Sequence, residues 1–157
     1  MELETTRFGK VDIDPGEVIT FTQPILGFQE HRRFVLMPGP SPALRWLQSI
    51  TSGELAFILI DPKSIIPDYK IEISQHDLAE LSLSDLSEGE VYTLVVVPDD
   101  ASKIRTNLKA PIIMNLKQCL GKQVVLDRSD YPIQYYLAQA KDPGGEAREA
   151  SNARSNA

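Results

Sequence analysis

The chain has 157 residues, of which 42% are hydrophobic and 24% charged, and it carries a net charge of −6 with one cysteine and two histidines. This length fits one domain, and the composition excludes a disordered chain and a membrane-spanning protein, because the longest apolar runs are only strand-sized. A single cysteine excludes a disulfide within the chain and, with so few histidines, a zinc site of the common Cys/His kind. Residues 1–10 are polar and contain no apolar secretory signal, so a cytoplasmic location is expected.

The first half of the chain is patterned as short strands separated by Gly, Pro and Asp. The expected strands are residues 11–13, 17–21, 34–37, 44–50 and 55–60. The last of these is a continuous apolar run, which suits a strand covered on both faces. Pro62 and Pro67 then bracket a loop, because proline cannot donate to a strand ladder.

The second half contains one helical signal among further strands. Residues 69–73 alternate apolar and polar side chains, which predicts a half-buried strand. Ser74 and Asp77 form a capping box before Leu78 and Leu81 at helical spacing, so a short helix is predicted over about residues 75–83. The remaining expected strands are 91–97, 103–108, 111–116 and 123–126. Strands repeated at intervals of about 8–12 residues predict a barrel or a sandwich.

The end of the chain has a different composition. Residues 139–157 contain a Gly-Gly pair and no large apolar side chain. Such a segment cannot offset the entropy lost on ordering, so we expect a single β domain over residues 1–138 and a disordered tail over 139–157.

Charge is unevenly distributed along the sequence. Residues 53–100 carry 11 acidic and 2 basic side chains, whereas residues 101–126 carry 5 basic and no acidic side chains. If the acidic part shares one face, it attracts a basic protein and repels nucleic acid. Ordinary solvation of these charges is the alternative. The basic stretch could instead face the acidic one across the fold or bind an acidic partner.

Residue types that carry out catalysis are sparse and isolated. His31 lies in a polar segment and His76 in the first turn of the expected helix, so both are expected to be inert. Cys119 has apolar neighbours and is expected to be a buried, unreactive thiol. No phosphate-binding glycine loop is present. Direct nucleic-acid binding is disfavoured, because residues 101–126 contain no aromatic side chain to stack on bases and the whole chain is acidic.

A series of short motifs runs through the chain in an order that resembles one known family. They are Arg7-Phe-Gly9, Ile19-Thr-Phe21, Ile25-Leu-Gly-Phe28, Leu47-Gln-Ser49, Ala56-Phe57, Asp61-Pro62, Tyr69, Thr106-Asn-Leu-Lys-Ala-Pro111, Ile112, Ile113, Asn115, Gly121-Lys-Gln-Val-Val-Leu126 and Tyr131. Over about residues 3–137 the chain resembles the FliW family of flagellar assembly factors, and residues 107–115 are the most specific part.

The resemblance implies a mainly β fold: a small closed or partly open antiparallel barrel with one short helix. It implies a monomeric cytoplasmic protein without catalytic activity or cofactor, which does not bind nucleic acid or membranes. The implied partners are flagellin and the translational regulator CsrA, a basic RNA-binding dimer that represses flagellin mRNA. Accumulating flagellin would remove the protein from CsrA, and the freed regulator would stop flagellin synthesis until export resumes.

The candidate partner-binding residues are the polar or aromatic members of these motifs: Gln48, Ser49, Phe57, Asp61 and Asn107. Their alternative interpretation is structural, with Phe57 in the core and Asp61 and Asn107 capping turns. Two other functions stay open from the residues alone. One is a barrel that binds flavin or another small molecule, which no sequence feature favours, and the other is a nucleic-acid-binding barrel.

Overall fold

A computed structural model describes residues 1–139, which form short strands, one α-helix and several single-turn 3-10 helices. The strands are β1 (Glu2–Thr5), β2 (Gly9–Asp12), β3 (Ile19–Phe21), β4 (Arg33–Pro38), β5 (Leu44–Ser49), β6 (Ala56–Ile60), β7 (Glu90–Val96), β8 (Arg105–Thr106), β9 (Ile112–Asn115), β10 (Leu120–Gln123) and β11 (Tyr135–Tyr136). The helix is α1 (Gln75–Glu80), and the 3-10 helices are η1 (Pro15–Glu17), η2 (Pro62–Ser64), η3 (Leu86–Glu88), η4 (Ala101–Lys103) and η5 (Leu137–Gln139).

Seven of the strands close into a barrel. Their order around the ring is β7-β6-β5-β4-β3-β10-β9, and β9 pairs back onto β7 to close it. Every pair in the ring is antiparallel except β3 and β10, which run parallel. The predicted mainly β barrel with one short helix is therefore confirmed, and the parallel pair is its one departure from an antiparallel ring.

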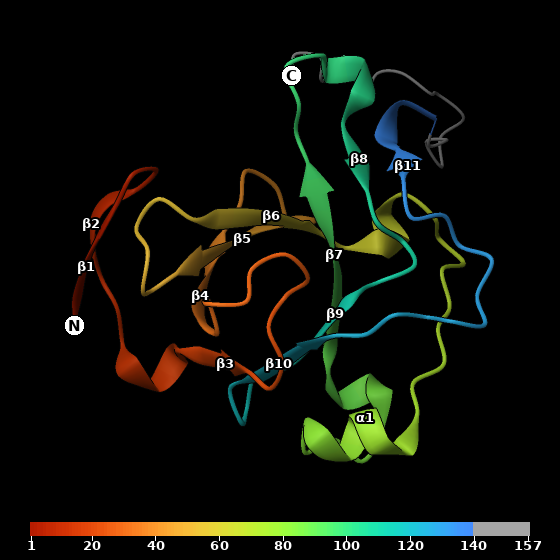
Figure 1. Cartoon of the computed structure of the whole chain (residues 1–157), viewed down its shortest axis with the longest axis horizontal. Helices are drawn as coiled ribbons and strands as arrows, with labels where there is room; N and C mark the ends of the chain where they lie inside the picture. The colour runs from red at the N-terminus through yellow and green to blue at the C-terminus, as the bar shows by residue number, and fades with distance from the viewer. Residues whose placement is uncertain (140–157) are drawn as a thin grey trace.

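Two further parts are attached outside this ring. The β1–β2 hairpin forms a separate two-stranded sheet, on the left of Figure 1. The end of β7 extends past the barrel and pairs with β8, which pairs in turn with β11 (Figure 1). Within residues 1–139, no helix is both long and apolar enough to cross a membrane.

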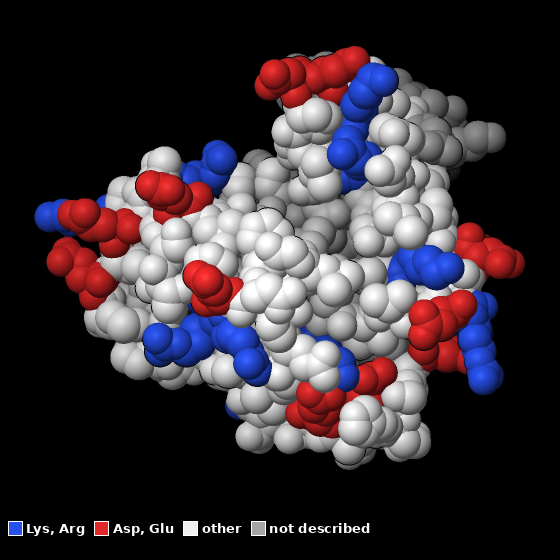
Figure 2. Space-filling view, in the orientation of Figure 1, with Lys and Arg blue, Asp and Glu red and all other residues white. Residues whose placement is uncertain are grey.

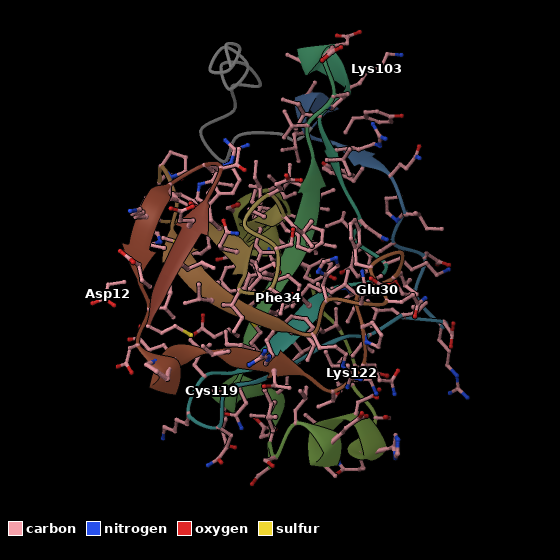
Figure 3. All side chains as sticks on the ribbon, turned by 60° about the vertical axis from the view of Figure 1, so that its left-hand side comes forward. Asp12, Glu30, Phe34, Lys103, Cys119 and Lys122 are labelled. Carbon is pink, nitrogen blue, oxygen red and sulfur yellow. The ribbon has the colours of Figure 1, made fainter. Side chains whose placement is uncertain are left out.

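The barrel interior is filled by large apolar side chains. They are Ile19, Phe21, Ile25, Phe34, Leu47, Leu59, Tyr92, Ile112 and Met114. Phe21 and Phe34 meet edge to face with ring centroids 5.3 Å apart, and Figure 3 shows Phe34 in the middle of the strands. Burial of these side chains supplies the main favourable term in folding.

The helix α1 covers the outside of β9 and β10. Leu78, Leu81 and Leu83 pack against Ile113 and Val124 from these strands and their extension. All four residues of β9 are consequently buried. This arrangement explains why residues 111–116 form a nearly continuous apolar run.

The predicted N-cap Ser74 is confirmed at α1. The Ser74 hydroxyl accepts the Asp77 N–H at 3.1 Å and donates to the Asp77 carboxylate at 3.0 Å. The helix ends earlier than predicted, at Glu80, because Ser82 adopts a left-handed conformation with φ of 57°.

Several predictions of local structure were wrong or displaced. The strand expected over 17–21 is shortened to Ile19–Phe21, because η1 extends to Glu17. Residues 69–73 alternate in burial as predicted, but they pair with no strand among residues 1–139. The strand expected over 123–126 lies at Leu120–Gln123. The strand expected over 103–108 shrinks to Arg105–Thr106, because Asp100 caps η4 immediately before it.

The structure agrees with the prediction for His76 but not with the one for Cys119. His76 lies in the first turn of α1, as predicted, and its side chain is 85% exposed. Cys119 is only half-buried, which contradicts the expected burial: it lies in the turn between β9 and β10 at φ of 56°, with Sγ 3.1 Å from the Gly16 carbonyl oxygen. His31 is half-buried in the loop before β4. The predicted tail lies outside the described residues except for Gln139, the last residue of η5.

Candidate functional site

Gln48, at the end of β5, is fully buried and holds the loop that follows it. Its Nε2 atom lies 3.0 Å from the Ser49 carbonyl oxygen and 3.1 Å from that of Leu55, with those of Ser52 and Gly53 at 3.4 and 3.3 Å. Its Oε1 atom is buried without a hydrogen-bond partner. Gln48 therefore acts as an internal brace, and any part in partner binding is indirect, through the loop over residues 50–55.

Ser49 shapes the same loop from the next position. Its hydroxyl accepts the N–H groups of Thr51 and Ser52 at 3.1 and 3.0 Å, and the side chain has no exposed surface. The loop then joins the β1–β2 hairpin, because Thr6 N–H donates to the Gly53 carbonyl at 3.0 Å. Gln48 and Ser49 thus connect the barrel to the hairpin.

Phe57 lies on β6 and is half-buried against the interior cluster. Its ring meets Phe28 edge to face at 4.8 Å and lies 5.9 Å from Phe34. These contacts match the core role that the sequence left as its alternative. Because Phe57 is only partly buried, it is the aromatic candidate that a partner can touch.

Asp61 is exposed and caps η2, where its carboxylate accepts the Lys63 N–H at 3.0 Å. It also lines a groove of about 460 Å³ that separates residues 69–71 from residues 90–92, called the β7 groove below. The turn-capping alternative is therefore seen at Asp61, and the carboxylate is at the same time available to a ligand in the groove.

Asn107 follows β8 and also caps a turn. Its side-chain oxygen accepts the Lys109 N–H at 3.0 Å, and its own N–H donates to the Leu94 carbonyl of β7 at 3.4 Å. Among the predicted residues, Gln48, Ser49 and Phe57 come together on the adjacent strands β5 and β6. Asp61 lies past the other end of β6, and Asn107 follows a different strand, so the five do not form one site.

Acidic and basic parts of the sequence meet at α1. Lys122, on β10, has only 9% of its side chain exposed and lies 2.6 Å from carboxylate oxygens of both Asp77 and Glu80. Figure 3 shows Lys122 beside this helix. The basic stretch therefore faces the acidic one across the fold at this lysine, which is one of the two arrangements that the sequence left open.

These contacts change the acidity of all three groups. Partial burial works to raise the pKa of Asp77, but hydrogen bonds from Lys122 and Ser74 outweigh it and lower that pKa. The hydrogen bond from Lys122 lowers the pKa of Glu80. Burial works to lower the pKa of Lys122, and its bonds to the two carboxylates raise it overall.

The acidic residues do not gather into one continuous patch on the face shown in Figure 2. Asp and Glu side chains lie in several separate groups, most of them toward its rim, with uncharged surface between them. No group of three or more His, Cys, Asp or Glu side chains within residues 1–139 is arranged to hold a metal ion.

The β7 groove is not predicted by the sequence patterns. Its walls come from residues 69–71 and 90–92, with Pro42, Asp61, Pro62 and Lys63 from the loops before β5 and after β6 and with Leu86, Ser87 and Gly89 from η3 and its end. Two sequence features contribute to its walls: the alternating segment at 69–73 and Pro62, two residues after the end of β6. Neither feature shows by itself that the two segments face a common space.

Comparison with known proteins gives a consistent result across the described chain. The family model described as FliW protein matches residues 2–137. The flagellar assembly factor FliW of Natranaerobius thermophilus is 38% identical over 152 residues, which cover 96% of this chain and 99% of that protein. The protein of the same name from Thermoanaerobacter pseudethanolicus is 35% identical over 159 residues and covers both chains completely.

A solved structure agrees with these relatives. The crystal structure of the flagellar assembly factor FliW superposes with a TM-score of 0.79 at 31% sequence identity, over 87% of this chain and 96% of that one. The sequence similarity over nearly the whole length and the shared barrel both support the same family assignment. The chain belongs to the FliW family.

Proposed function

We propose that this protein is a flagellar assembly factor that works by binding other proteins, without an enzymatic step. The observation that carries the proposal is the family match over residues 2–137, together with relatives of the same name that are covered along almost their full length. The proposed partners are flagellin and the CsrA-type translational regulator. Binding to one in place of the other couples flagellin synthesis to export.

The packing of the barrel supports a binding role on the outer surface. Phe21, Phe34 and Met114 fill the interior and have no exposed surface, so the barrel does not offer its inside to flavin or another small molecule. We further propose that the protein acts in the cytoplasm as a monomer and contacts the regulator directly, without binding RNA or a membrane itself.

A gel-shift experiment tests this function directly. The purified full chain is added to the CsrA-type regulator and flagellin leader RNA of the same organism, with and without flagellin. We expect the protein to release the RNA and flagellin to reverse the release. If the RNA stays bound and calorimetry detects no complex of the chain with the regulator or with flagellin, the proposed function is wrong.

A further inference from the structure

The outer face of the barrel carries a row of apolar side chains across four adjacent strands. The row consists of residues that lie opposite one another on β4, β5, β6 and β7: Met37, Trp46, Ile58 and Val95. Opposite residues share one face of a sheet. Leu47 and Leu59, the chain neighbours of Trp46 and Ile58, have no exposed surface and fill the interior, so the row points outward. All four side chains are only half-buried, and they are called the outer row below.

The tip of the β1–β2 hairpin rests on Trp46, in the middle of the outer row. The Phe8 ring meets the Trp46 ring edge to face, with centroids 5.7 Å apart. The Arg7 guanidinium carbon lies 4.3 Å from the centre of the same ring, which is a cation–π distance. Arg7 is exposed and forms no ion pair within residues 1–139, so Trp46 holds its charged group. Figure 1 shows the hairpin beside β4, β5 and β6.

The turn of the hairpin is fixed by its own hydrogen bonds. The Phe8 N–H donates to the Thr5 hydroxyl at 2.8 Å, and that hydroxyl donates to the Gly9 carbonyl at 2.9 Å. Gly9 has φ of 69°, a left-handed conformation that glycine adopts without a steric penalty. The tip therefore keeps Arg7 and Phe8 in place whether or not it touches the barrel.

Gly53, in the loop after β5, is the place where the backbone of the hairpin meets the barrel. The Thr6 N–H donates to the Gly53 carbonyl at 3.0 Å. A Cβ atom on Gly53 would collide with the Glu4 carbonyl oxygen and would lie 3.3 Å from the Thr5 Cα atom. Only a residue without a side chain therefore lets β1 rest on this loop, which the buried Gln48 side chain holds in place.

The hairpin is otherwise weakly attached. Within residues 1–139, the bond from Thr6 to Gly53 is the one hydrogen bond that joins residues 2–12 to the chain beyond Ile13, and no barrel strand pairs with β1 or β2. No apolar side chain of residues 2–12 is buried, whereas Ile13, directly after β2, is only 5% exposed. A two-stranded sheet is marginally stable by itself. The position of the hairpin therefore depends on a few contacts near its tip.

We propose that the β1–β2 hairpin is a hinged cover over the outer row, held shut by the contacts of its tip with Trp46. The hinge lies at buried Ile13, and residues 2–12 move about it as a unit. In the open state the bond from Thr6 to Gly53 is broken and Trp46 is exposed, while the barrel stays closed. This inference goes beyond the proposed function and does not depend on it, because the occupant of the row is the hairpin of the same chain.

Fluorescence tests the cover, because Trp46 is the only tryptophan in the chain. Gly53→Ala places a methyl group against the backbone of β1 and leaves Arg7 and Phe8 unchanged. We expect its emission to shift to longer wavelength and acrylamide to quench it more strongly, because the hairpin is pushed away from the ring. Ser52→Ala is the control in the same loop, and circular dichroism confirms that each variant folds. If folded Gly53→Ala fluoresces like the original chain, the inference is overturned.

Amide exchange on the ¹⁵N-labelled full chain tests the hinge without any substitution. Opening breaks the bond from Thr6 to Gly53 but not the barrel bond from the Phe21 N–H to the Arg32 carbonyl. After correction for intrinsic rates, the Thr6 amide is expected to exchange at least about a hundredfold faster than the Phe21 amide. Low concentrations of urea should accelerate exchange mainly at Phe21, because opening exposes less surface than unfolding. Equal protection and equal urea dependence would show that the hairpin leaves only when the barrel unfolds, which overturns the inference.

Removal of the cation tests what holds the hairpin shut. Arg7→Gln keeps a polar side chain but removes the charge above Trp46, so the Thr6 amide is expected to exchange about fivefold faster. Lys10→Gln is the matched control: it removes a cation from the same hairpin, where the ammonium group lies 3.9 Å from the Glu4 carboxylate. Equal exchange at Thr6 in the two variants would show that the contact with Trp46 does not hold the hairpin, and the inference would be wrong.

Discussion

The ammonium group of Lys122 lies 2.6 Å from Asp77 Oδ1 and 2.6 Å from Glu80 Oε1, and this ion cluster fastens α1 to the barrel. Two carboxylates one helical turn apart share one largely buried cation. Removal of the cation would leave both carboxylates close together and without compensation.

We therefore expect Lys122→Met to lower the free energy of unfolding by about 3 kcal/mol. Urea denaturation at pH 7 measures this change. Lys117→Met is the control, since Lys117 is exposed and forms no ion pair among residues 1–139, and it should stay within about 0.5 kcal/mol of the original protein. A similar small change for Lys122→Met would show that apolar packing alone holds α1.

The same cluster predicts how stability depends on pH. The pKa values of Asp77 and Glu80 are lowered from their ordinary 3.8 and 4.5 by the Lys122 contacts. Their contribution is therefore complete above about pH 5 and is lost as the pH falls through and below these values. The pKa of Lys122 is raised above 10.5, so its contribution is complete below that pH and is lost as the pH rises further.

Urea midpoints between pH 7 and pH 3 check the acid side of this prediction. The Asp77→Asn, Glu80→Gln double variant is expected to lose less stability over this range than the original chain. Hydrogen bonds from Ser87 and Ser102 also lower the pKa values of Asp85 and Asp100, so some acid dependence remains in the variant. If the urea midpoint of the double variant falls with pH as steeply as that of the original chain, the cluster does not contribute to acid unfolding.

The buried side chain of Gln48 can be replaced by two side chains of similar size, Met and Glu, and we expect different losses of stability from the two. Gln48→Met removes the donor to the loop carbonyls and is expected to cost about 2 kcal/mol. Gln48→Glu places a carboxylate against the carbonyl oxygens of Ser49 and Leu55, so its cost at pH 7 is larger. The folded-state pKa of this new carboxyl is raised, and its destabilisation therefore decreases as the pH falls toward its ordinary range.

Thermal unfolding of both Gln48 variants at pH 7 and pH 5 separates these effects. Gln118→Glu serves as a control because Gln118 is exposed in the turn between β9 and β10. A Gln48→Glu variant as stable as Gln48→Met at pH 7 would contradict the assignment of Nε2 as the atom that faces the carbonyls.

The features that the sequence predicted well are local ones. The Ser74 cap of α1 depends on a contact within four residues. The apolar run at 55–60 forms a strand as predicted, but only Leu59 and Ile60 are buried, so its expected cover on both faces is wrong for the rest. Residues 69–73 have the alternation of a strand, but a strand forms only when another strand pairs with it, and these residues pair with none among residues 1–139. Lys122 pairs with Glu80 and Asp77, which lie 42 and 45 positions earlier in the chain. This contact therefore depends on tertiary structure and has no local sequence signal. Polarity alone predicts exposure for Gln48, and its full burial follows from the loop that it braces.

Gly121 gives a final prediction at the contact between β10 and β3. A Cβ atom at this position would lie 2.9 Å from Cε1 of Phe21, which has no exposed surface and is packed against Phe34. Gly121→Ala is therefore expected to cost about 1–3 kcal/mol, because the ring must move within a filled core. Gly16→Ala is the control, since the Cβ atom there would meet only the Asp14 side chain at 3.4 Å. Equal unfolding midpoints in urea for the two variants would show that the interior around Phe21 yields easily, and the barrel would then be less tightly packed than its buried side chains indicate.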